Sequence, residues 1–69
     1  MTPATITLNG QPHAMAGEAT LDRLLASLGL AGKPVVVELD SRAVLPREHA
    51  QTLIKDGARV EIVTLAAGG

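Results

Sequence analysis

The stretch that decides the fold is Thr20-Leu21-Asp22-Arg23-Leu24-Leu25-Ala26-Ser27-Leu28-Gly29. Its leucines follow the first at spacings of three, four and seven residues, which places them along one face of a helix. Thr20 is a suitable N-cap, and Asp22 puts an acid in the first turn, where the helix dipole favours it. Gly29 is placed to end the helix in a left-handed cap. The stretch therefore predicts one amphipathic helix with an apolar face to bury.

A β-hairpin is predicted on the N-terminal side of this helix. Residues 5–8 (Thr-Ile-Thr-Leu) alternate between polar and apolar, and Asn9-Gly10, a strong hairpin signal, follows at once. Residues 11–16 are then the returning strand. Pro12 has no N–H to donate to a ladder, so this strand is expected at an edge of the sheet.

A second pair of strands is predicted after the helix. Residues 35–39 (Val-Val-Val-Glu-Leu) form a short β-branched run, and Asp40-Ser41 offers a turn into the apolar run 43–45. Pro46 is expected to stop that run, because it cannot continue a strand ladder.

The last third of the chain predicts a helical turn and a final strand. Pro46 can begin a single helical turn within residues 46–54, with Leu53 and Ile54 covering the core. Asp56-Gly57 marks a turn, and residues 60–65 (Val-Glu-Ile-Val-Thr-Leu) are expected to form the last strand, buried on at least one side.

These elements predict an α+β fold of the β-grasp kind, in the order ββαββ, short turn, final β. A mixed sheet would pack one main helix on one face, and the first and last strands can pair in parallel because the helix supplies the crossover. Residues 1–65 are expected to form one domain, and residues 66–69 a flexible C-terminal tail.

Composition excludes several classes of function. Six basic against seven acidic residues leave a net charge of −1, and Phe, Tyr and Trp are absent, so a nucleic-acid partner is not expected. The absence of cysteine excludes a thiolate nucleophile and Cys-ligated zinc. The apolar runs are too short to span a membrane and the first 15 residues lack signal-peptide character, so a cytoplasmic protein without a membrane partner is expected.

An ordinary active site is not apparent in the sequence. The chain has two histidines, His13 and His49, each expected at the surface or half-buried, and a metal site between them is disfavoured because further ligands in register are lacking. Ser27 is expected on the helix surface. We therefore expect neither a metal nor a cofactor bound by this chain.

The unusual segment is the end of the chain. After Leu65 come Ala66-Ala67-Gly68-Gly69, which carry no side chain larger than a methyl group. One interpretation is a frayed terminus. The other is a segment threaded through a narrow channel of a partner, since four extended residues reach about 13–14 Å and glycines remove Cβ clashes.

Together these segments resemble the ubiquitin-like β-grasp sulfur carriers, most closely the thiamine-pathway ThiS family. The segments that carry the resemblance are residues 6–10, 20–25, 35–39, 46–48 and 55–63 and the terminal Gly68-Gly69. Three features depart from the family pattern: Asp40-Ser41 replaces a usual Asn-Gly turn, the stretch before Pro46 is one residue longer, and His49 replaces a common aromatic residue.

The resemblance implies a sulfur carrier that acts as a protein co-substrate and not as an enzyme. Gly69, with Gly68 beside it, would be the site of adenylation and thiocarboxylation, and Leu65, Ala66 and Ala67 the partner-binding tail. An E1-like adenylyltransferase of the ThiF type would use MgATP to activate Gly69. Sulfur would come from cysteine through a cysteine desulfurase, and a thiazole synthase of the ThiG type would receive it.

Three alternatives remain open from the residues. The same chemistry could serve molybdopterin synthesis or tRNA thiolation. A ubiquitin-like modifier that forms isopeptide bonds would share the Gly68-Gly69 end, and an inert β-grasp interaction domain would have a frayed one. Arg59 and Glu61 flank the last strand and are expected near whatever docks the tail.

Overall fold

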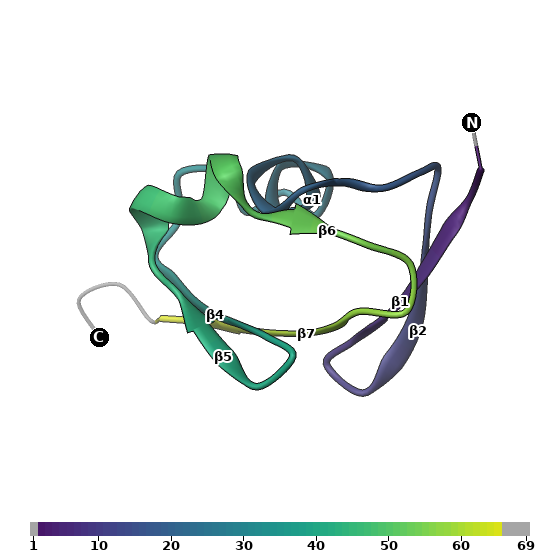
Figure 1. Cartoon of the computed structure of the whole chain (residues 1–69). Helices are drawn as coiled ribbons and strands as arrows, with labels where there is room; N and C mark the ends of the chain where they lie inside the picture. The colour runs from purple at the N-terminus through teal and green to yellow at the C-terminus, as the bar shows by residue number, and fades with distance from the viewer. Residues whose placement is uncertain (1, 66–69) are drawn as a thin grey trace.

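The computed structural model describes residues 2–65, so the predicted tail, residues 66–69, lies outside the described residues. The elements follow in the order β1 (Ala4–Leu8), β2 (Gln11–Met15), β3 (Ala19–Thr20), α1 (Leu21–Ser27), β4 (Val35–Leu39), β5 (Arg42–Val44), the 3₁₀ helix η1 (Pro46–Gln51), β6 (Leu53–Ile54) and β7 (Arg59–Thr64). One sheet has the strand order β2-β1-β7-β4-β5, and β3 pairs with β6 separately. In Figure 1, α1, η1 and β6 lie on one side of the five-stranded sheet.

The C-terminal strand β7 lies in the middle of the sheet. It pairs in parallel with β1, with Leu8 opposite Val60, and antiparallel with β4, with Val37 opposite Ile62. The parallel pairing of first and last strands is therefore confirmed, and α1 lies within the crossover that joins them. The expected edge position of the strand containing Pro12 is also confirmed.

Side chains from two turns hold β7 in place. Asn9, at φ 50° in the β1–β2 turn, accepts a hydrogen bond from the Ile62 N–H at 2.7 Å and donates to the Ile62 carbonyl at 3.1 Å. Asp40, also at φ 50°, accepts from the Arg59 N–H at 2.9 Å. These turn residues therefore extend the backbone ladders on both sides of β7.

Helix α1 begins and ends near the predicted residues. Thr20 is the N-cap residue, but its hydroxyl donates to the Asp22 carboxylate and makes no capping bond to the backbone. At the other end the Leu30 N–H donates to the Leu25 carbonyl at 2.8 Å, and Gly29 has φ 76°. This is a Schellman cap, as the position of the glycine predicts.

The core lies between the helix side of the sheet and α1. Its buried members are Ile6, Leu21, Leu24, Leu25, Val37, Ile54, Ala58, Val60 and Ile62. The apolar face of the helix is not buried uniformly. Leu21, Leu24 and Leu25 belong to the buried cluster, whereas Leu28 packs against it and is half-buried.

Three sequence expectations need correction in the segment after β4. Leu53 does not cover the core, because β6 alternates: Leu53 is 45% exposed while Ile54 is fully buried. His49 is buried, at 9% exposure, because η1 packs against α1. Strand β5 ends at Val44 and not at Leu45, since the Leu45 N–H donates to the Glu48 carboxylate at 2.9 Å and so caps η1.

Candidate functional site: the end of the central strand

The candidate site is the C-terminal end of β7, after which the last residues of the chain follow. Val60 and Ile62 of β7 face the core, whereas Arg59, Glu61 and Val63 are exposed. The Leu65 N–H donates to the Pro34 carbonyl at 3.0 Å, which ties the chain beside the start of β4 immediately after the strand ends. The base of the predicted tail is therefore fixed to the body of the domain.

Leu65, the described member of the predicted partner-binding segment 65–67, is 49% exposed and borders a hollow at this end of the domain. The hollow is also lined by Leu25, Leu30, Lys33, Val35 and His49. The Nε2 atom of His49 lies 3.3 Å from the Val44 carbonyl oxygen, which fixes the ring beside β5. The predicted site residues Ala66, Ala67, Gly68 and Gly69 lie outside the described residues.

A second group of exposed side chains lies on the face of the sheet opposite α1. Val36 of β4 stands directly opposite Val63 of β7, and Glu38 stands directly opposite Glu61. Glu61 was expected near whatever docks the tail, whereas Val36, Val63 and Glu38 were not. Strict alternation along residues 35–39 could have identified Val36 and Glu38, since Val37 is buried and both of its neighbours are exposed.

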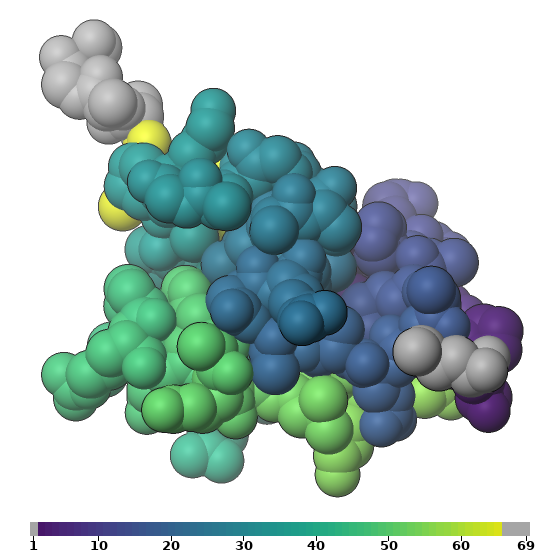
Figure 2. Space-filling model, turned by 90° about the horizontal axis from the view of Figure 1, so that it is seen from above, coloured from purple at the N-terminus to yellow at the C-terminus, as the bar shows by residue number. Residues whose placement is uncertain are grey.

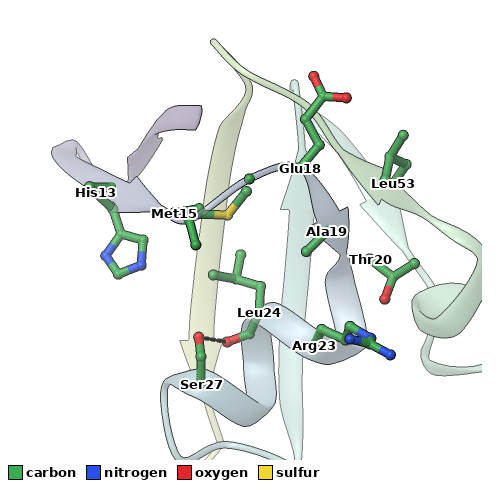
Figure 3. Close-up of a pocket in the computed structure, with 12 residues that line it drawn as sticks. His13, Met15, Glu18, Ala19, Thr20, Arg23, Leu24, Ser27 and Leu53 are labelled. Atoms are coloured by element: carbon green, nitrogen blue, oxygen red, sulfur yellow. Dashed lines mark hydrogen bonds between the residues drawn. The ribbon is translucent and has the colours of Figure 1, made fainter. Parts of the chain in front are cut away.

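A groove runs along the other side of the domain, between β2 and α1. Figure 2 looks onto this side, with α1 between the purple N-terminal strands and the green segment that contains η1. Figure 3 shows His13, Met15, Arg23, Leu24 and Ser27 around the groove. The Ser27 hydroxyl donates to the Leu24 carbonyl at 2.7 Å, which fits the expected helix-surface role. His13 and Ser27 thus line a groove and do not join the end of β7.

The titratable and metal-binding groups add little chemistry to the site. The hydrogen bond from the Thr20 hydroxyl holds the pKa of the Asp22 carboxyl below its usual value, at an exposed position on α1. Within residues 2–65, no three His, Asp or Glu side chains gather in an arrangement suited to a metal ion. None of the helices in that part of the chain has the length and apolar character needed to cross a bilayer.

A mixed five-stranded sheet packed on one main helix, with the C-terminal strand at its centre, defines a ubiquitin-like β-grasp domain. The crystal structure of the thiamine biosynthesis protein ThiS from Geobacter metallireducens is similar, with a TM-score of 0.80 and 31% identity over 94% of this chain and 99% of that one. Residues 6–69 match the ThiS family. This chain belongs to the ThiS family of sulfur carriers.

Curated relatives support the same family and add a second kind of protein. The sulfur carrier protein ThiS of Thermus thermophilus is 38% identical over 64 residues, covering 93% of this chain and 98% of that protein. The thiazole synthase of Paramagnetospirillum magneticum is 31% identical over 64 residues, again 93% of this chain. The chain spans about a fifth of the length of the thiazole synthases that it matches, 20% in each of two.

Proposed function

We propose that this chain carries sulfur for thiazole formation in thiamine biosynthesis, with the Gly69 carboxylate as its working group. The observation that carries the proposal is the match to the ThiS family, which runs through Gly68 and Gly69. The central position of β7 supports it, because the segment after Leu65 starts from a strand held by neighbours on both sides. The carrier acts in the cytoplasm as a protein co-substrate and not as an enzyme.

The chemistry begins with activation of Gly69. Its carboxylate attacks the α-phosphate of MgATP in an E1-like adenylyltransferase of the ThiF type, which releases pyrophosphate and leaves an acyl-adenylate. Adenylate is a far better leaving group than a carboxylate oxygen, so a sulfur nucleophile can then displace AMP. The sulfur originates from cysteine as a persulfide formed by a cysteine desulfurase. Attack of the persulfide on the acyl-adenylate releases AMP and gives an acyl disulfide, and a second thiol reduces that disulfide, forming a new disulfide and leaving a Gly69 thiocarboxylate.

The proposed acceptor is a thiazole synthase of the ThiG type. The two thiazole synthases that match this chain over 64 residues support a connection between the carrier fold and that enzyme. A thiocarboxylate at the end of a short extended segment presents sulfur at a high effective concentration, in place of free sulfide that must diffuse. Ala66 and Ala67 add little bulk, which suits a narrow channel in each partner.

Intact-mass measurement tests this proposal. The protein is incubated with the adenylyltransferase, MgATP and a sulfur source, and we expect the mass increase for one oxygen replaced by sulfur, mapped by fragmentation to Gly69. Two controls, one without ATP and one with a chain extended by one alanine after Gly69, should show no increase. A sulfur adduct at another residue, or a thiol-resistant conjugate to a target lysine, contradicts the carrier assignment and favours the modifier.

A further inference from the structure

The side chain of Asn9 continues the sheet where the backbone of β1 ends. Strand β1 stops at Leu8, whose partner in β7 is Val60. Beyond that pair the primary amide of Asn9 accepts from the Ile62 N–H at 2.7 Å and donates to the Ile62 carbonyl at 3.1 Å. A primary amide has the donor and the acceptor of a peptide group, so Asn9 stands in for the strand residue that β7 lacks on this side.

The pair Asn9-Gly10 is chemically reactive as well as a turn. An asparagine followed by glycine is the sequence most prone to spontaneous deamidation, because glycine has no Cβ to shield its backbone nitrogen. Asn9 is the one asparagine in the sequence, and both residues of the pair are exposed. Deamidation of asparagine in this protein therefore maps to a single position.

The reaction needs water and no other reagent. The Gly10 backbone nitrogen attacks Cγ of Asn9, the bond from Cγ to the side-chain nitrogen breaks, and ammonia leaves with the proton from the Gly10 nitrogen. A cyclic imide then joins residues 9 and 10. Water opens this ring at either carbonyl and gives aspartate or isoaspartate, so one water is consumed, one ammonia is released, and nothing is oxidised or reduced.

The folded sheet opposes the first step. Attack requires the Asn9 side chain to rotate until Cγ meets the Gly10 nitrogen, and such reactions depend steeply on geometry. Because Ile62 holds both the oxygen and the nitrogen of the amide, the side chain can rotate freely only after both hydrogen bonds break. The reaction is therefore confined to molecules in which this part of the sheet has opened.

We propose that Asn9 is a modification site, deamidated when the contact between the β1–β2 turn and β7 opens and protected by the two Ile62 bonds while it is closed. The product cannot restore both bonds. A carboxylate at position 9 can accept from the Ile62 N–H, but it has no proton for the Ile62 carbonyl and brings a second oxygen against it. Each modified chain thus keeps a covalent record of past opening and holds β7 less firmly.

The other hairpin provides a matched comparison. Asp40 and Ser41 have φ 50° and 71°, and Asn9 and Gly10 have φ 50° and 81°, so both pairs have the positive φ angles of a type I′ turn. Within residues 2–65, the Asp40 carboxylate accepts one hydrogen bond, from the Arg59 N–H at 2.9 Å. The double variant Asp40→Asn, Ser41→Gly therefore builds a second Asn-Gly turn, whose side chain is held at one atom and not at two.

The test measures deamidation at both positions of this double variant. The protein is incubated at mildly alkaline pH, once folded and once in urea, and peptide mapping by mass spectrometry follows the replacement of NH2 by OH at each position. In urea the two positions should react at the same rate. In the folded protein position 9 should react about tenfold or more slowly than in urea, and several-fold more slowly than position 40.

The wild-type chain, folded and in urea, repeats the measurement at Asn9 without any substitution. Asn9→Asp then represents the product, and its melting temperature should be about 4–8 °C lower than that of the wild type, since one hydrogen bond is lost. Equal rates at positions 9 and 40 in the folded variant overturn the protecting role of Ile62. Equal folded and unfolded rates at Asn9, or an unchanged melting temperature for Asn9→Asp, overturn the proposal.

Discussion

Replacing Ile54 with alanine should cost this small domain much of its stability. The Ile54 side chain is fully buried in the core, and Ile→Ala changes at such positions cost about 2–5 kcal/mol. A domain of 69 residues is expected to have roughly 3–10 kcal/mol of stability in all. At about 4–8 °C per kcal/mol, the melting temperature should fall by at least about 8 °C. Urea and thermal unfolding, followed by circular dichroism, measure both quantities.

Leu53→Ala is the control, one residue away on the same two-residue strand. Leu53 is 45% exposed, so its truncation should change the free energy of unfolding by no more than about 0.5 kcal/mol. The contrast depends on the pairing of Ile54 with Ala19 and of Leu53 with Thr20. Equal losses in the two variants, or a larger loss for Leu53→Ala, would show that β6 is displaced by one residue and that this reasoning is wrong.

Deleting Gly69, or adding one residue after it, should abolish ATP–pyrophosphate exchange by the adenylating enzyme and leave the melting temperature unchanged, because the carboxylate moves by about 3.3–3.6 Å. Near-normal exchange would mean that the tail is merely frayed. Gly68→Val should be similarly inactive, since a β-branched side chain restricts the backbone and widens the chain. Thr20→Val should raise the Asp22 pKa toward its usual value in an NMR titration. Because the folded pKa is depressed, the stability that this hydrogen bond provides is present above the unfolded pKa and lost as the pH falls through the folded one.

The features predicted correctly from sequence are those with a strong local signal. The period of the leucines in α1, the Asn9-Gly10 turn and the alternation of β7 each depend on neighbours within a few residues. The parallel pairing of β7 with β1 is not local, and it was expected because the helix supplies the crossover that such a pairing requires.

The features missed are those decided by tertiary packing. Strands β3 and β6 have two residues each, too few for any periodicity, and they exist because Ala19 and Ile54 meet across the domain. His49 is buried by the approach of η1 to α1, which the polar sequence around it does not indicate. The opposition of Glu38 and Glu61 depends on a register between strands more than twenty residues apart, which composition and spacing leave undetermined.

The placement of β7 also has a mechanical consequence. An enzyme that draws the end of the chain into a channel would pull along the axis of β7. That strand pairs with β4 from Val60 to Thr64, and on its other side it pairs with β1 at Arg59 and Val60, with the Asn9 side chain bonded to Ile62. Tension in this direction shears the cross-strand bonds together and does not open them one at a time from an end. The domain can therefore stay folded while force is applied to its C-terminal end. The hydrogen bond from the Leu65 N–H to the Pro34 carbonyl would be the first to bear that force.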